Sequence, residues 1–201
     1  MADDTLALMD HLGCTAVHLV GHSLGGLIAQ CVAIKAPERI RSLSLLCTFS
    51  RGSDATKLSW PMFWTGLRTF VGTRQMRRRA FCEIVLPPQL WVERDQWLDR
   101  LAIIFGHDLA DQPPVVMKQL AAMKAYDATE QLPEIAHVPT LVVGAKFDRI
   151  STPDVAQRLA NSFPGCRYER FDQAAHGVTV QFTNEINELL LSHFASAEPN
   201  N

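Results

Sequence analysis

A serine, an aspartate and a histidine occur along this chain in an order that suits nucleophilic catalysis. Ser23 stands in the sequence Gly21-His22-Ser23-Leu24-Gly25, after an apolar run and before a stretch with helical patterning. A strand, Gly-x-Ser-x-Gly and a helix together hold a serine on a sharp turn with its hydroxyl exposed. We expect the flanking glycines to avoid clashes with the adjoining strand or helix. Ser23 is therefore the candidate nucleophile.

The candidate acid and base follow two later strand-like segments. Asp148 lies four residues past the apolar segment 140–144, and His176 follows the segment 167–171. A serine needs a base to take its proton and a third group to orient that base. Parallel sheets place catalytic groups at the carboxyl ends of strands, where both loops begin. We therefore predict that Ser23, Asp148 and His176 are the catalytic residues.

Other titratable residues compete for these roles. Asp54 follows the second predicted strand and is the alternative acid. We interpret Asp172 as a loop cap and His22 as a residue packed beside the nucleophile. The remaining histidines lack metal-ligand spacing, so we interpret them as structural and predict neither a metal nor a cofactor. They are His11, His18, His107, His137 and His193.

Composition limits the class of protein. The 201 residues suffice for one domain with an inserted subdomain, and 47% hydrophobic with 20% charged residues is ordinary for globular proteins. A net charge of -2 argues against nucleic-acid or membrane partners, and no apolar stretch could span a bilayer. Five cysteines without a Cys-x-x-Cys pair, and an acidic N-terminus unlike a secretion signal, favour a cytoplasmic setting.

Hydrophobic periodicity predicts strands that alternate with helices. Strands are expected over residues 16–20, 42–47, 140–144 and 167–171, and helices over residues 2–12, 24–35, 153–162 and 179–194. This alternation implies an α/β fold with a parallel sheet flanked by helices. The first strand has few polar residues, as in a strand covered on both faces, whereas the charges in the last strand indicate a sheet edge. In the first helix Leu6, Met9 and Leu12 are expected to share one face. The residues of the last helix that are expected to face inward are Ile186, Leu189, Leu190 and Phe194.

A block over residues 53–131 has no convincing strand and is expected to form a helical cap. Residues 1–52 and 132–201 would then form the core domain. The cap aromatics are expected to be mostly core residues, and one or two of them to line an apolar pocket; they are Trp60, Phe63, Trp64, Trp91 and Trp97. A basic cluster in the cap is either a solvated helix face or a clamp for an acidic substrate. It consists of Arg74, Arg77, Arg78 and Arg79.

The chain resembles the α/β-hydrolase family in three places. These are the elbow at residues 21–26, the strand and acid loop at residues 141–148 with Pro153 beyond it, and Ala175-His176-Gly177. A serine elbow with a helical cap is similar to the esterases, enol-lactonases, carbon–carbon bond hydrolases and cofactor-free haloperoxidases of that family. The dehalogenase branch has an aspartate in place of the serine.

The resemblance implies acyl transfer from a small ester or lactone. Ser23 would attack the carbonyl, His176 would accept and return the proton, and Asp148 would orient the imidazole. The backbone N–H of Leu24, at the start of a helix, would be one oxyanion donor. Peroxidation through a peracid would use the same three residues.

The chain departs from the family pattern before the elbow, where only one helix precedes the first strand. The family has further strands there, and a loop after one of them supplies a second oxyanion donor. We therefore expect this chain to be the C-terminal part of a longer hydrolase, a partial α/β-hydrolase fold that begins at an internal methionine. The first strand would lie at an open edge, which favours pairing with another copy or a partner chain. The alternative function is a truncated or non-catalytic protein that needs such a partner.

Overall fold

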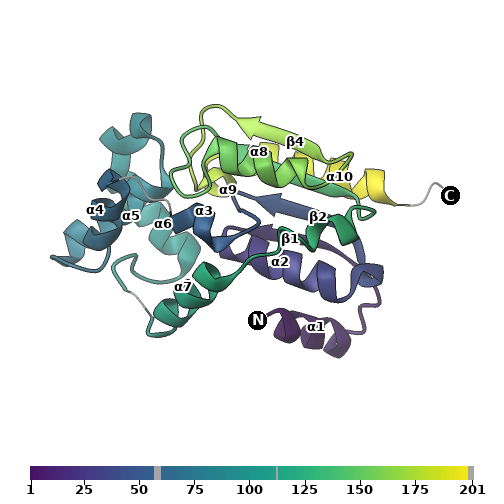
Figure 1. The fold of residues 1–201 in the computed structure, drawn as a ribbon. Helices are drawn as coiled ribbons and strands as arrows, with labels where there is room; N and C mark the ends of the chain where they lie inside the picture. The colour runs from purple at the N-terminus through teal and green to yellow at the C-terminus, as the bar shows by residue number, and fades with distance from the viewer. Residues whose placement is uncertain (57–59, 112, 199–201) are drawn as a thin grey trace.

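A four-stranded parallel sheet organises the molecule, with helices on both faces and a helical block beyond one end (Figure 1). The computed structural model describes residues 1–56, 60–111 and 113–198, without the side chains of residues 55–63. The strands follow the order β1-β2-β3-β4. They are β1 (Val17–His22), β2 (Ile40–Leu46), β3 (Thr140–Ala145) and β4 (Arg167–Phe171). Each strand begins and ends within two residues of its predicted bounds.

Helices cover the two faces of the sheet because β2 and β3 present apolar side chains on both. Leu43 and Leu45 of β2 pack with Val142 of β3 against α2 (Leu24–Lys35) and α8 (Pro153–Asn161). On the other face, residues of the same strands form a cluster with the C-terminal helices. Further elements are α1 (Ala2–His11), which packs on α2, and the short 3-10 turns η1 (Pro37–Arg39) and η3 (Leu132–Ile135).

The outer strands differ from the central ones in burial. The expectation that β1 is covered on both faces is wrong, since most of its residues are only half-buried and Val20 is 40% exposed. The reason is its place at one edge of the described sheet, as the open-edge prediction required. The opposite edge is β4, in agreement with its charges, and its Arg167 and Arg170 pair with Glu169 and Asp172. Asp172 is thus an ion-pair partner rather than a loop cap.

The predicted C-terminal helix is two helices, α9 (Val178–Gln181) and α10 (Thr183–Ala197). Phe182 breaks the helix with φ -126° and ψ 50°. Ile186 is buried, and Leu189 and Leu190 pack partly against the sheet, as expected. In α1, Met9 is buried and Leu6 packs on the core, but Leu12 is exposed because the helix ends at residue 11, before Gly13 with φ 66°.

The N-terminal end of β1 is tied to the end of α10 by His18. Its Nδ1 lies 2.8 Å from Ser42 Oγ on β2, and its Nε2 lies 2.9 Å from Glu198 Oε1. The ring also stacks on Phe194 with centroids 4.7 Å apart. His18 thus has the structural role that the sequence indicates.

Helices make up the described part of the block over residues 53–131, together with the isolated bridge between Arg51 and Asp127. They are α3 (Gly52–Thr56), α4 (Trp60–Arg68), α5 (Arg74–Val85), η2 (Pro88–Glu93), α6 (Arg94–Phe105) and α7 (Val115–Ala125). Figure 1 shows α4, α5 and α6 grouped beyond the ends toward which the strand arrows point. Throughout the described residues, helices lack the combination of length and apolarity that crossing a membrane requires.

Candidate active site

Ser23 occupies a strained turn between β1 and α2. Its φ of 53° and ψ of -121° lie outside the regions that residues with a side chain prefer, and Cys47 is the other described non-glycine residue with positive φ. The Ser23 N–H donates to Leu46 O at 3.0 Å, which anchors the turn to the end of β2. Strained backbone of this kind clusters at functional sites, where the surrounding structure must hold it.

The glycines around Ser23 differ in what they allow. A Cβ on Gly21 would overlap the carbonyl of Gly25, as the sequence predicts. A Cβ on Gly25 itself would meet nothing within 4 Å, so the expectation of a clash there is wrong. The crowded glycine on the helix side is Gly26, where a Cβ would stand 2.5 Å from Thr48 Cγ2. The close approach of Thr48, just past the end of β2, therefore requires a glycine at position 26, one residue beyond the Gly-x-Ser-x-Gly motif.

His176 connects Ser23 with Asp148. Its Nε2 lies 2.9 Å from Ser23 Oγ, and its Nδ1 lies 2.9 Å from Asp148 Oδ2. The carboxylate can only accept, so Nδ1–H donates to it, and Nε2 is left to accept the serine hydroxyl proton. Both side chains are buried, with His176 and Asp148 exposed by 6% and 3%. The structure thus brings the three predicted residues together from loops after β1, β3 and β4.

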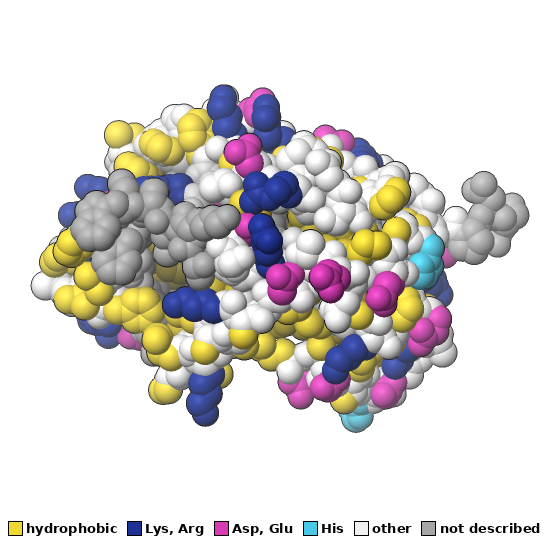
Figure 2. Space-filling view, viewed as in Figure 1, with side chains coloured by type: hydrophobic (Ala, Val, Ile, Leu, Met, Phe, Trp, Pro, Cys, Tyr) yellow, Lys and Arg dark blue, Asp and Glu magenta, His cyan; other side chains and the backbone are white. Residues whose placement is uncertain are grey.

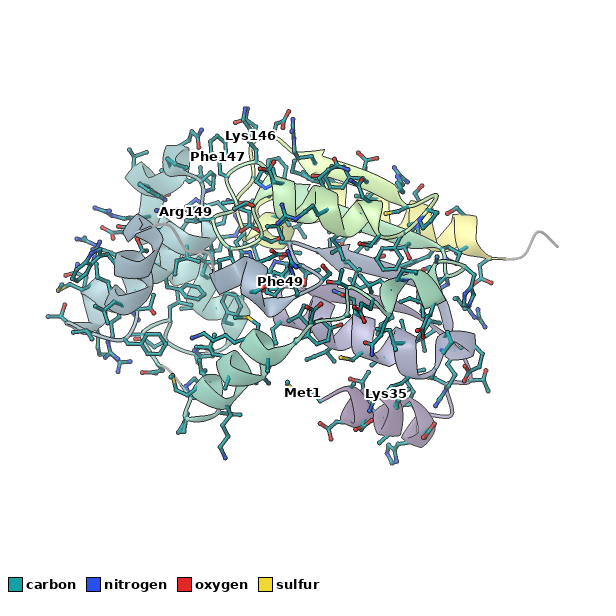
Figure 3. The ribbon with its side chains drawn as sticks, in the orientation of Figure 1. Met1, Lys35, Phe49, Lys146, Phe147 and Arg149 are labelled. Atoms are coloured by element: carbon teal, nitrogen blue, oxygen red, sulfur yellow. The ribbon has the colours of Figure 1, made fainter. Side chains whose placement is uncertain are left out.

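The loop after β3 holds the Asp148 carboxylate in place. Its Oδ1 accepts the N–H groups of Ile150 at 2.8 Å and Ser151 at 2.9 Å, which leaves Oδ2 for the imidazole. Figure 3 labels three residues of this loop, Lys146, Phe147 and Arg149, beside the cap helices, and Phe49, which is buried, nearer the centre of the view. Two backbone donors and the imidazole satisfy a carboxylate that has little contact with water.

His22 packs beside the site, as the sequence indicates. Its Nε2–H donates to the backbone carbonyl of His176 at 2.8 Å, and the two rings lie 5.0 Å apart. Burial, followed by repulsion from His176, lowers the pKa of His22 to about 4. The ring is therefore neutral at pH 7 and acts as a hydrogen-bond donor to the loop that carries His176.

The N–H of Leu24 is the first of α2, and the first N–H groups of a helix have no intrahelical acceptor. It stands next to the Ser23 hydroxyl, at the positive end of the helix dipole. An apolar cleft of about 190 Å³ opens from the Leu24 side chain. The cleft is lined by α2, by the end of α7 and by the N-terminus of the chain, and neither Ser23 nor His176 is part of the lining. Its residues are Met1, Ala2, Leu24, Leu27, Ile28, Cys31, Ala122, Met123 and Tyr126.

The alternative acid, Asp54, does not contact the imidazole in the structure. It is buried and pairs with Arg51 at 3.4 Å and Arg158 at 3.3 Å. The acid that hydrogen-bonds to His176 is Asp148.

The basic cluster on α5 is neither fully solvated nor free to clamp a substrate. Arg78 makes a bidentate contact with Asp108 at 2.7 and 2.8 Å, and Arg74 also reaches Asp108, at 2.9 Å. The arginines hold the pKa of Asp108 far below its usual range. Arg79 lies 3.4 Å from Asp95. Three of the four arginines therefore link cap segments to one another.

Cap aromatics are less buried than the sequence predicts. Trp91 and Trp97 pack partly against the core of the cap, whereas Trp64 is 48% exposed, and the side chains of Trp60 and Phe63 lie outside the described residues. Figure 2 shows apolar side chains at the cap end of the molecule, and the exposed residues of α4 to α6 include Leu67, Phe70, Val71 and Ile103.

A group of ligand-type atoms adjoins the three residues, with donors of His22, Cys47 and His176 all within 4.8 Å of one another. These donors do not fit a metal. Both nitrogens of His176 are already hydrogen-bonded, Nε2 to Ser23 and Nδ1 to Asp148, and His22 Nε2–H donates to a carbonyl. Burial and the Asp148 carboxylate raise the pKa of the Cys47 thiol well above its usual range, and only a thiolate is a good ligand.

Two residues around the site carry no sequence motif. Thr48 Oγ1 donates to Ser23 O at 2.8 Å, and Ser151 Oγ donates to Thr48 O at 2.6 Å. Neither residue was predicted from the sequence. Their one signal is position, since Thr48 follows the second predicted strand and Ser151 follows the acid loop.

A parallel sheet with a strained serine at a strand-to-helix turn defines an α/β enzyme of the hydrolase type. The family model of the alpha/beta hydrolase fold matches residues 1–181, so the chain belongs to the α/β-hydrolase family. A relative from Caulobacter vibrioides, named "Putative carbamate hydrolase RutD", is 30% identical over 98% of this chain and 72% of its own length. Another of that name from Stutzerimonas stutzeri is 27% identical over 97% of this chain and 72% of its own.

Solved structures share the fold. The enol-lactonase of Burkholderia xenovorans superposes with a TM-score of 0.77 at 22% identity, over 96% of this chain and 71% of that one. A hydrolase from Pseudomonas aeruginosa gives 0.77 at 24% identity, over 96% of this chain and 69% of that one. The predicted fold class is thus confirmed, and the chain is a hydrolase of the α/β type.

Proposed function

We propose that this protein is a serine hydrolase that cleaves a small carboxylic ester or lactone through an acyl-enzyme on Ser23. One observation carries the proposal: His176 is hydrogen-bonded to Ser23 Oγ on one side and to Asp148 on the other, at 2.9 Å each. An imidazole held in this way can take a proton from an alcohol and return it to a leaving group.

The reaction has two halves. In the first, Ser23 Oγ attacks the carbonyl carbon while His176 Nε2 takes the hydroxyl proton, and the Leu24 N–H stabilises the oxyanion. The tetrahedral intermediate then expels the alcohol, or the ring oxygen of a lactone, which takes the proton from His176. In the second half, water gives a proton to His176 and attacks the acyl-enzyme, and Ser23 leaves with that proton. Asp148 stabilises the imidazolium in both halves.

Leu24, the neighbour of Ser23, borders an apolar cleft between α2 and α7, which favours an apolar acyl group. One structural neighbour is an enol-lactonase, and the two relatives described above are named putative carbamate hydrolases. A substrate series should therefore contain esters of increasing acyl length, small lactones and carbamates, and we expect the short esters and lactones to react fastest.

A fluorophosphonate probe tests the proposal. It should label the purified protein at Ser23, and the Ser23→Ala variant should remain unlabelled while its circular dichroism stays that of the wild type. A folded wild-type protein that is neither labelled nor active toward the substrate series would contradict the proposal. The alternative function would then stand: a non-catalytic hydrolase-like protein, or a chain that needs a partner strand beside β1.

We also propose a reducing compartment such as the cytoplasm. All five cysteines are free, and Cys47 and Cys82 are buried. Free thiols of this kind are usual where disulfides do not persist. Oxidised and reduced samples should accordingly show the same stability.

A further inference from the structure

We infer that Thr48 is a positioning residue that couples the serine turn to the acid loop. The inference rests on the proposed function, since it concerns the arrangement of the same three residues. Thr48 lies just past the end of β2 and is 1% exposed. It touches neither the Ser23 hydroxyl nor the imidazole by hydrogen bond, so it acts through the backbone of its neighbours.

On one side, Thr48 holds the serine turn. Its Oγ1 donates to the carbonyl of Ser23 at 2.8 Å, and the Gly26 N–H donates to the same carbonyl at 2.9 Å. The side chain of Thr48 also fills the space over Gly26, where a Cβ would stand 2.5 Å from Thr48 Cγ2. Because Leu46 O accepts the Ser23 N–H, the end of β2 binds both the N–H and the carbonyl of the strained serine.

On the other side, Thr48 holds the acid loop. Its carbonyl accepts the Ser151 hydroxyl at 2.6 Å, and the Ser151 N–H donates to Asp148 Oδ1 at 2.9 Å. A continuous series of hydrogen bonds thus runs from the Ser23 carbonyl through Thr48 and Ser151 to the Asp148 carboxylate. Buried hydrogen bonds of this kind fix geometry, because breaking one leaves a polar group without water.

Cys47 turns the backbone between β2 and Thr48. Its φ of 46° turns the chain at the end of β2, and its N–H donates to Val143 O of β3 at 2.8 Å. The turn is therefore anchored to the sheet on the side of the acid loop and to the serine on the other. The two described non-glycine residues with positive φ, Ser23 and Cys47, are therefore joined by hydrogen bonds, since the Ser23 turn is bonded to Leu46 and Thr48, the neighbours of Cys47.

The test compares four single variants and one double variant. Thr48→Val removes the hydroxyl while keeping the shape, Thr48→Ser keeps the hydroxyl, and Ser151→Ala removes the second link. Thr140→Val is the matched control, because Thr140 is also a buried threonine whose hydroxyl donates to a backbone carbonyl, that of Val138 at 2.8 Å, at the other end of β3.

We expect Thr48→Val and Ser151→Ala to lower kcat by about 10- to 100-fold and to keep KM within about twofold of the wild type. The variants lose the correct positioning of the catalytic groups rather than the binding of substrate. Thr48→Ser, which keeps the hydroxyl, and the control Thr140→Val should both keep kcat near the wild-type value. The double variant Thr48→Val/Ser151→Ala should lose less than the product of the two single losses, because both belong to one network.

The NMR signal of the His176 Nδ1 proton gives a readout that does not need turnover. Ser151→Ala should shift or broaden this signal, and Thr140→Val should not. An unchanged signal and an unchanged kcat in Ser151→Ala and Thr48→Val would overturn the inference, as would an equal loss in Thr140→Val. Because the signal is read without substrate, it judges the network even if Ser23 is not labelled and the proposed function fails.

Discussion

The backbone of Ser23 makes its replacement informative. The strain at a side-chain-bearing residue with φ 53° costs about 1–3 kcal/mol, and glycine relieves it while losing about 0.5–1 kcal/mol of chain entropy. Ser23→Gly should therefore be more stable than Ser23→Ala by about 1 kcal/mol, although both lack the hydroxyl. Urea unfolding of the two variants measures the difference. Equal stability would mean that the turn carries no such strain.

The two candidate acids can be separated by one pair of variants. Asp148→Asn should lower kcat by about 10⁴-fold, because the imidazole loses the acceptor that fixes its tautomer. Asp54→Asn is the control, since Asp54 is also buried but pairs with Arg51 and Arg158. It should keep kcat within about threefold of the wild type. The same initial-rate measurement decides, and the reverse ranking would make Asp54 the acid.

His22 should make stability depend on pH. Its pKa is about 4 in the folded chain against 6.5 in the unfolded one, so the unfolded chain binds the extra proton between these values. The free energy of unfolding should fall by about 3 kcal/mol as the pH drops from 6.5 to 4. His22→Gln keeps a donor toward the His176 carbonyl and should lose this dependence. Denaturation curves of both proteins at several pH values test this, and parallel pH profiles would contradict it.

Because α2 packs closely against the end of β2, the two neighbouring glycines Gly25 and Gly26 should differ in their tolerance of a side chain. Gly25→Ala should be tolerated and should stabilise the helix by about 0.5–1 kcal/mol, because a Cβ there meets nothing. Gly26→Ala places a Cβ against Thr48 and should push α2 or the corner of β2 out of place, with loss of stability and of kcat. Thermal unfolding and initial rates of the pair measure this, and a tolerated Gly26→Ala would show that the two elements can separate.

Much of this arrangement could be predicted from the sequence, since three strands are short apolar runs, the fourth is a short segment with charges typical of a sheet edge, and Ser23, Asp148 and His176 each follow a strand. What the sequence could not give depends on contacts between distant segments. Gly26 rather than Gly25 is crowded because Thr48 approaches it, and the partners of the α5 arginines come from segments 16 to 37 residues away. The break in the C-terminal helix at Phe182 could likewise not be predicted, because the apolar pattern of the sequence continues across it.

In the molecule as described, β1 lies at one edge of the sheet, and we expect this position to favour assembly. An edge strand presents unpaired backbone groups, and Val20 on this one is 40% exposed. We propose that copies of the chain associate through this edge. Val20→Lys should reduce the associated fraction in sedimentation velocity, because a charge on an edge opposes strand pairing. A lysine at Leu191, which is 66% exposed on α10, is the control and should leave association unchanged.

Ser23 follows β1 and His176 follows β4, so these two hydrogen-bonded side chains come from opposite edges of the described sheet. Outer strands open locally at less cost than central ones. Fraying of either flank would separate the alcohol from the imidazole while the middle of the sheet stays intact. On heating, turnover should thus be lost before the calorimetric transition, and the gap between the two temperatures would measure how firmly the flanks are attached.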